Sequence, residues 1–332
     1  MAGKLEGKVA LVTGSGQGVG RAIAIGFAQQ GAKVVTNNEK RLDGSLTNGG
    51  VMKDEDYAKL SDERKAWFDR AREETQGDAY TTAETIVAMG YEATPCIADI
   101  SKWDEAKRLV DFTVETYGRI DIVANIAGSF GFSPFDEISE ELWDRVTSVK
   151  PKGYFNVMRH AVPYMKEQGD GGRIINCTSR AWLGDILRHV QYCTANAGVV
   201  GLTRGAAIEL AEFGITCNAF SPWAKTRSSY ELEAHVEVGS FKAALTDRPL
   251  ATYEQSPEPE RLVPFLVYLA SDEGAKISGS IFELGGENIK WYSDPIGRKI
   301  ITKYDGPWTI DEVFDAVERN FLPDYESIVP GL

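Results

Sequence analysis

Short runs of β-branched and other apolar residues alternate along the chain with longer segments of helical periodicity. The short runs lie at residues 8–13, 32–36, 92–98, 120–125, 173–177, 215–220 and 280–284. Strands that alternate with helices are typical of a parallel sheet with helices on both faces. The pattern therefore predicts an α/β fold with a doubly wound, Rossmann-like parallel sheet of about seven strands.

Composition narrows the class of protein. Hydrophobic residues make up 43% of the 332 residues, and the net charge is −13. Nucleic acid and anionic lipid both attract a basic surface, so we expect neither nucleic acid nor membrane as a partner. The chain has no C-x-x-C pair, no signal peptide and no apolar run of about 18 residues, so we expect a cytoplasmic protein with free thiols.

A glycine-rich turn follows the first predicted strand. In "LVTGSGQGVGRA" the glycines are Gly14, Gly16, Gly18 and Gly20, and a helical pattern follows. Glycines let a diphosphate approach the backbone, and the start of a helix offers free N–H groups and a positive dipole end. The spacing differs from G-x-G-x-x-G because position 19 is valine. The turn nevertheless indicates dinucleotide binding.

Several motifs occur together in a familiar order. They are "TGSGQGVG", "NIAG" at 125–128, "INCTS" with Ser179 thirteen residues before Tyr192, "YCTAN" at 192–196, and "ITCNAFSPW". This series, over residues 5 to 286, resembles the short-chain dehydrogenase/reductase superfamily. The resemblance implies a single NAD(P)-binding domain at 1–286 and hydride transfer to or from a carbon that bears oxygen.

The resemblance also implies which residues hold the cofactor. They are Gly14, Ser15, Gln17, Gly18, Val19, Gly20, Asn38, Asp99, Ile100, Asn125, Ala127, Gly128, Tyr192, Asn196, Pro222 and Thr226. An aspartate at the ribose-selecting position would favour NAD, but this chain has Asn38 there. Lys40 and Arg41 could pair with a 2′-phosphate, whereas Glu39 opposes it. The cofactor is NAD or NADP, and the residues lean towards NAD.

The chain departs from the family at the active-site lysine. In the family, tyrosine is the general acid or base, serine binds the substrate oxygen, and lysine lowers the tyrosine pKa. Here Ser179 and Tyr192 are present, but Asn196 replaces the lysine and cannot supply a charge. Lys150, followed by Pro151, occupies the position of a family asparagine that kinks the preceding helix.

We therefore interpret Lys150 and Asn196 as an exchanged pair, with the Lys150 ammonium replacing the missing charge near Tyr192. Ser179, Tyr192, Asn196 and Lys150 are the predicted catalytic residues. Alternatively Lys150 faces solvent, as most lysines do, and the protein has lost its proton chemistry.

Two segments interrupt the alternating pattern. The charged insertion at 39–79 is either a solvated surface element or a flap near the adenosine end of a cofactor or over a substrate tail. Residues 287–332 form a C-terminal extension with a capping box at Thr309 and Glu312. Its apolar stripe, which includes Val313 and Phe314, predicts a helix that docks on its own domain or on a neighbouring subunit.

The substrate region is expected after Trp223. In the family, the stretch corresponding to residues 223–260 closes over the substrate. Phe130, Trp182 and Trp223 either line an aromatic pocket or belong to the core. Such a pocket suits a small-molecule substrate that is cyclic, aromatic, steroid-like or acyl. His189 and His235 show no metal-ligand spacing, so no metal site is expected.

The sequence thus predicts an NAD(P)-dependent oxidoreductase that interconverts a secondary alcohol and a ketone. Two alternatives remain open: a non-redox lyase or isomerase on the same scaffold, and a non-catalytic cofactor-binding subunit. Family members commonly pair through the helices corresponding to 141–168 and 191–213. We therefore expect a homodimer or homotetramer.

Overall fold

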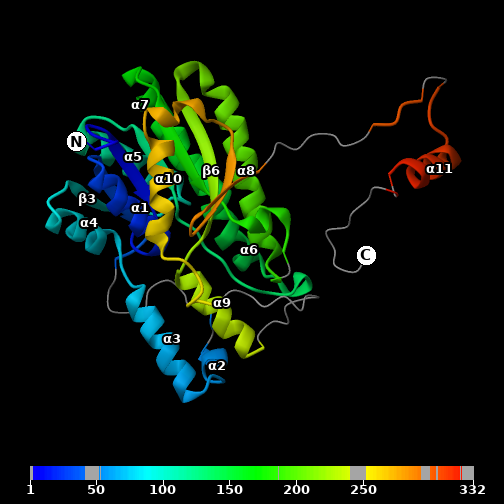
Figure 1. The fold of residues 1–332 in the computed structure, drawn as a ribbon, viewed down its shortest axis with the longest axis horizontal. Coiled ribbons are helices and arrows are strands. Elements are labelled where there is room, and N and C mark those ends of the chain that lie inside the picture. Colours follow the sequence, from blue (N-terminus) through cyan, green and yellow to red (C-terminus); the bar gives the residue numbers. More distant parts are fainter. Residues whose placement is uncertain are drawn as a thin grey trace. The chain divides into compact units, whose positions relative to one another are not determined.

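The computed structural model describes residues 3–41, 52, 54–185, 187–239, 252–292, 300–303, 306–321 and 323. The chain divides into two compact units, Met1–Trp291 and Tyr292–Leu332, and each is described by itself. Figure 1 shows the elements in sequence colours. Among the described residues, no helix combines the length and the apolar character needed to cross a membrane.

The first unit is built on one sheet in the order β3-β2-β1-β4-β5-β6-β7-β8. Its strands are β1 (Val9–Thr13), β2 (Lys33–Asn38), β3 (Ala93–Ile97), β4 (Ile122–Asn125), β5 (Gly172–Cys177), β6 (Ile215–Trp223), β7 (Ile281–Gly285) and β8 (Asn288–Trp291). The seven predicted strands are confirmed, and they pair in parallel. The strand order reverses between β1 and β4, where open α/β sheets bind their ligands.

An eighth strand extends the sheet beyond the sequence prediction. β8 pairs antiparallel with β7, and all four of its residues are exposed. It therefore lacks the alternation of buried and exposed positions that marks a half-buried strand in sequence. The first unit extends to Trp291, whereas the predicted domain ended at residue 286.

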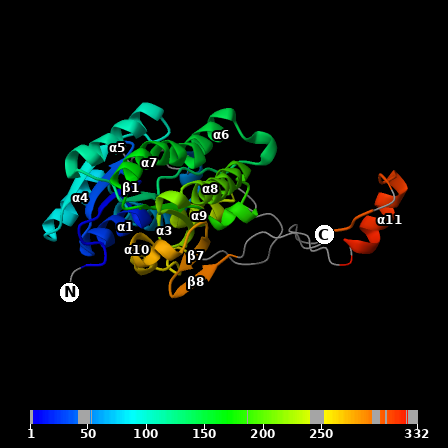
Figure 2. The ribbon, with the colours of Figure 1, turned by 90° about the horizontal axis from the view of Figure 1, so that it is seen from above.

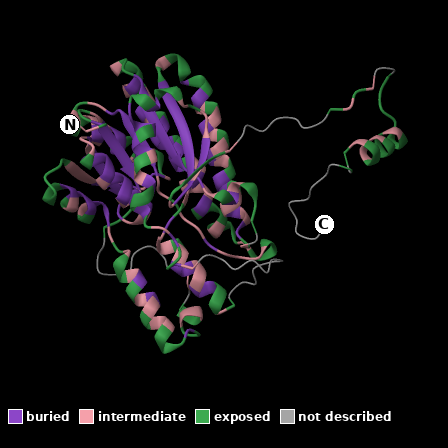
Figure 3. Ribbon diagram, in the orientation of Figure 1, coloured by how far each residue is buried: buried purple, intermediate pink, exposed green. Residues whose placement is uncertain are grey.

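Helices cover both faces of the sheet. One face packs against α1 (Gly18–Gln29), α4 (Ala79–Ala88) and α10 (Val263–Ala270); the other against α5 (Trp103–Tyr117), α7 (Tyr154–Gln168) and α8 (Val190–Glu209). Figure 2 shows α5 and α7 on one side of the strands and α1 and α10 on the other. Figure 3 shows that the central strands are buried, as expected for a parallel sheet covered on both faces.

The insertion packs against the segment that follows β6. It contains α2 (Asp54–Tyr57) and α3 (Asp62–Glu74), and α3 lies beside α9 (Arg227–Glu237) in Figure 1. Leu60, Phe68 and Ala71 from the insertion are buried against Tyr230, Ala234 and Tyr253, which we call the insertion–lid cluster. On its surface, Arg64 pairs with Glu233 at 2.9 Å and with Glu237 at 2.5 Å. The insertion therefore supports α9 through apolar packing and ion pairs, a role that we call the brace.

Truncation of Phe68 tests this brace. Phe68 is 4% exposed and meets the Tyr230 ring edge-on at 5.0 Å. We expect Phe68→Ala to lower the free energy of opening of the insertion–lid cluster by about 3–5 kcal/mol, because a large buried side chain leaves a cavity. Native-state hydrogen exchange of the α9 amides measures this change. Phe135→Ala is the matched control, because Phe135 is 80% exposed; equal protection of α9 in both variants would contradict the brace.

The second unit contains α11 (Ile310–Asn320), which begins with the predicted capping box. Thr309 accepts a hydrogen bond from the Glu312 N–H at 3.3 Å, and the Thr309 N–H donates to the Glu312 carboxylate at 2.8 Å. Its stripe residues Ile310 and Phe314 are 77% and 68% exposed.

Candidate active site

A cavity of about 760 Å³ opens at the carboxyl ends of the parallel strands. Most residues predicted to bind cofactor or substrate line it: Gly14, Gln17, Gly18, Val19, Gly20, Asn38, Asp99, Ile100, Ala127, Gly128, Phe130, Lys150, Ser179, Tyr192, Pro222, Trp223 and Thr226. They come from segments far apart in the sequence. The parallel sheet brings them together because its strands end at one edge.

The glycine turn makes the floor of this cavity. Gly14 has φ of +63°, and a Cβ at this position would lie 2.6 Å from the Ala127 backbone. Only glycine fits this close approach without displacement. The Thr13 hydroxyl accepts hydrogen bonds from the backbone N–H groups of Ile126 at 3.0 Å and Ala127 at 3.3 Å. The loops after β1 and β4 are therefore fixed to each other around a cradle with room for a diphosphate.

The end of β2 forms the side of the cavity predicted for the adenosine ribose. The Asn38 Oδ1 atom is buried and accepts no hydrogen bond from the part of the chain that the structure describes. Two nearby cations have acidic partners, since Lys40 lies 3.6 Å from Glu39 and Arg41 lies 3.8 Å from Asp78. A buried acceptor without a donor fits a ribose hydroxyl, and the cradle fits a dinucleotide phosphate.

Ser179 and Tyr192 both line the cavity, after β5 and on the first turn of α8. Burial raises the pKa of Tyr192 to about 12, although hydrogen bonds with Ser179 and Asn196 act to lower it. The direction is opposite to the lowering expected from a nearby cation. At neutral pH Tyr192 is a phenol that can donate a proton.

Lys150 is buried at the kink between α6 (Glu140–Thr147) and α7. Its φ of −125° and ψ of 128° are not helical, so the predicted kink before Pro151 is present. The side chain is only 4% exposed and reaches the cavity. Its Nζ donates to Asn196 Oδ1 at 3.4 Å. Burial lowers the Lys150 pKa, and the neighbouring Cys177 opposes this change.

Asn196 connects this lysine to the catalytic helix. It is fully buried on α8, and its Nδ2 donates to the Tyr192 carbonyl oxygen at 2.8 Å. The Thr178 hydroxyl donates to the Asn196 carbonyl oxygen at 3.0 Å. The amide is therefore held with its oxygen available to the Lys150 ammonium.

Four predicted site residues do not line the cavity. Ser15 is buried and bonds with the Asn37 backbone, and Asn125 is buried with its Nδ2 donating to Asn176 Oδ1 at 2.9 Å. Asn196 lies behind Lys150, and Trp182 lies outside the lining. Ser15 and Asn125 fix the loops on which the lining residues stand.

The structure adds lining residues that the sequence analysis did not assign. Asp185 and His189 lie between Ser179 and Tyr192 in the sequence. Arg145 is on α6, and Arg227 begins α9 within the predicted substrate region. A partial signal existed for the first two, because they lie on the short stretch of chain between two catalytic side chains, although only some residues of that stretch line the cavity. Arg180 and Arg188, on the same stretch, are not among the lining residues.

The chain is similar to known proteins over most of its length. Residues 63–231 match the family model described as short chain dehydrogenase. An uncharacterized oxidoreductase of Thermotoga maritima is 32% identical over 85% of this chain and 97% of its own length. A 3-oxoacyl-[acyl-carrier-protein] reductase of the same organism is 30% identical over 85% of this chain and 98% of its own.

One solved structure is similar to this chain over nearly the whole length of both proteins. The crystal structure of a short chain dehydrogenase from Mycobacterium avium is 30% identical with a TM-score of 0.76, and the match covers 99% of this chain and 98% of that chain. The chain belongs to the short-chain dehydrogenase/reductase family. It is accordingly an NAD(P)-dependent oxidoreductase.

Proposed function

We propose that the protein interconverts a secondary alcohol and a ketone on a cyclic, aromatic, steroid-like or acyl substrate, with Lys150 and Asn196 acting together in place of the usual lysine. One observation carries the proposal: Lys150 is buried beside Asn196 in the cavity that Ser179 and Tyr192 line. A buried ammonium is costly to hold without a role. The observation favours a working site over a subunit that has lost its chemistry.

The residues would divide the reaction as follows. The Ser179 hydroxyl and the Tyr192 phenol bind the substrate oxygen, and the nicotinamide cofactor supplies or accepts the hydride. In reduction, Tyr192 donates its proton to the oxygen as negative charge develops there. Lys150 would supply positive charge to the same cavity, and Asn196 holds its ammonium in place.

The walls of the cavity support the substrate class. Phe130, Phe132 and Trp223 line it, and the two phenylalanine rings meet edge-on at 5.9 Å. Aromatic walls favour flat or cyclic apolar substrates. We therefore expect cyclic and aromatic ketones to be better substrates than open-chain ones.

The test is the near-ultraviolet absorbance of the reduced cofactor with a panel of cyclic, aromatic, steroid and acyl ketones. We expect turnover with at least one cyclic ketone, and its loss in Tyr192→Phe. Product formation without net change of cofactor would instead indicate a lyase or isomerase. Cofactor binding with no turnover across the panel and its alcohols would overturn the proposal.

The raised pKa of Tyr192 predicts which direction depends on pH. Below about pH 12 the group is mostly protonated, so the reductive acid is fully present while the oxidative base grows about tenfold per pH unit. We expect kcat/KM for alcohol oxidation to rise roughly 100-fold from about pH 7 to about pH 9, with little change in reduction. Steady-state profiles in both directions measure this; a falling reduction rate with flat oxidation would place the pKa below neutrality.

We also propose NAD as the preferred cofactor. The unpartnered Asn38 Oδ1 suits a ribose hydroxyl, and the acidic partners of Lys40 and Arg41 disfavour a 2′-phosphate. We expect NAD to bind about tenfold or more tightly than NADP, because a phosphate would have to compete with two existing ion pairs. Titration calorimetry with both nucleotides decides it, and tighter binding of NADP would refute the preference.

A further inference from the structure

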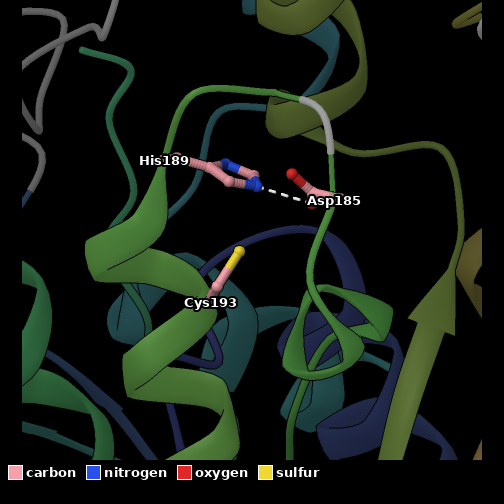
Figure 4. A group of neighbouring side chains, drawn as sticks. All are labelled: Asp185, His189 and Cys193. Atoms are coloured by element: carbon pink, nitrogen blue, oxygen red, sulfur yellow. Dashed lines mark hydrogen bonds and ion pairs between the residues drawn. The ribbon is translucent and has the colours of Figure 1, made fainter. Parts of the chain in front are cut away.

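Asp185, His189 and Cys193 form a cluster at the start of α8. One ligand-type atom from each lies within 4.8 Å of the others, and Figure 4 shows the three side chains converging. His189 Nε2 donates to Asp185 Oδ2 at 2.6 Å. His189 is only 6% exposed. The cluster could hold a metal ion or could act as a hydrogen-bonded pair of acid and imidazole.

The distances favour the pair. Two ligands about 2.0–2.1 Å from a tetrahedral zinc ion lie roughly 3.3 Å apart, so the separation of 2.6 Å between Asp185 and His189 fits a shared proton better. Burial and the charge of Asp185 raise the pKa of Cys193 to about 11, which keeps its thiol protonated at neutral pH. Cys193 is also absent from the residues that line the cavity, whereas Asp185 and His189 both line it.

The pair is fixed next to the catalytic tyrosine. The His189 ring stacks on Phe132 at 5.5 Å with an interplanar angle of 15°, and its centroid lies 4.9 Å from that of Tyr192. Asp185 accepts from the Leu187 N–H at 2.9 Å through its other oxygen. A carboxylate has about four acceptor positions, so Asp185 retains capacity for a further donor. It offers a carboxylate to the cavity beside the Phe132 and His189 rings.

The charges of the cavity indicate what kind of donor fits. Arg145, Arg227 and Lys150 line the same cavity as Asp185. An additional ammonium group would meet this positive charge, whereas a neutral hydroxyl would not. A hydroxyl would still gain a charge-assisted hydrogen bond from the carboxylate.

We propose that Asp185, held by His189, binds a second hydroxyl group of the substrate, in the same cavity as the oxygen that Tyr192 protonates. The substrate class is then a cyclic or aromatic hydroxyketone and the corresponding diol. Asp185 is the binding residue and His189 a positioning residue. This inference rests on the proposed function.

The first experiment compares 1-tetralone with its derivatives that carry one hydroxyl on the aromatic ring. We expect kcat/KM for the best hydroxylated ketone to exceed that of 1-tetralone by about 10- to 100-fold. In Asp185→Ala the ratio should fall close to one. His189→Phe keeps the ring stack but not the hydrogen bond, and should lower the ratio partly. The ratio cancels any general damage to the enzyme. Asp136→Ala, at an exposed site, is the matched control and should leave the ratio unchanged.

A second measurement keeps the inference testable if no tetralone turns over. Ketones cannot react with the oxidised cofactor, so calorimetry of this complex measures substrate binding alone. Hydroxylated tetralones should bind more tightly than 1-tetralone in the wild type and equally in Asp185→Ala. Equal binding in the wild type would overturn the subsite, while turnover of both ketones would leave the proposed function standing.

The metal alternative has its own outcome. When zinc chloride is added to the chelator-treated protein, we expect only weak binding with no defined number of zinc ions per chain. The variant Cys193→Ser should keep the preference for hydroxylated ketones. One tightly bound zinc ion per chain, lost in Cys193→Ser, would overturn the subsite in favour of a metal centre.

Discussion

Lys150→Met should lower kcat/KM for the preferred ketone by about 10²- to 10⁴-fold, the range associated with loss of general acid–base assistance. Lys150 is 4% exposed, and its Nζ bonds to Asn196 within the cavity that contains Ser179 and Tyr192. Methionine has a similar length but no charge. The variant therefore removes the buried cation while it conserves most of the packing.

The pH dependence of this loss adds a second test. Burial lowers the pKa of Lys150, so the wild type itself loses this charge at a lower pH than an exposed lysine would. We therefore expect the gap between wild type and Lys150→Met to be widest near neutrality and to shrink as the pH rises through the pKa of Lys150. A gap that is constant with pH would assign Lys150 a packing role.

Stability and a control variant separate chemistry from folding. A buried ammonium costs desolvation free energy that methionine avoids, so thermal denaturation of Lys150→Met should occur at the same temperature or higher. Lys152→Met, at an exposed position two residues away, should keep full activity. Wild-type kcat/KM in Lys150→Met would show that the buried cation has no part in the reaction.

The sheet was predictable because its strands are buried on both faces and read as apolar runs. β8 was not, since Asn288–Trp291 is exposed along its length and carries no such run. The insertion–lid cluster was hidden for a different reason. Phe68 and Ala71 lie in a segment dominated by charged residues, and their partners Tyr230 and Ala234 lie about half the chain away in sequence. Contacts of that range come from the fold and leave no local periodicity.

In the active site, too, some features follow from local sequence motifs and others depend on long-range packing. The positions of Ser179 and Tyr192 followed from motifs, because the family spacing is local. The burial of Lys150 could be hypothesised only from two coupled departures, at 150 and at 196, since a lysine alone indicates a solvated surface. The raised pKa of Tyr192 could not be predicted, because it comes from desolvation, and desolvation depends on packing that no motif encodes.

The proposed exchange of lysine and asparagine between positions 150 and 196 can be reversed by mutation. Lys150→Asn removes the buried cation. Asn196→Lys adds a second ammonium group close to that of Lys150, because Lys150 Nζ now lies 3.4 Å from the Asn196 side-chain oxygen. We expect each single variant to lose about 100-fold or more in kcat/KM, the first for lack of charge and the second from repulsion between like charges. The double variant Lys150→Asn with Asn196→Lys restores one cation and one amide, in the arrangement usual for the family.

The activity of the double variant should exceed that of either single variant by at least about tenfold. With single losses of about 100-fold, that result corresponds to a coupling of about 4 kcal/mol between the two positions. Steady-state kinetics on the four proteins closes the cycle. Asn196→Gln is the matched control, because it keeps an amide without adding charge, and it should lose less than Asn196→Lys. Losses that simply add in the double variant would mean that the two positions act independently, and the buried lysine would then need another explanation than replacement of the missing one.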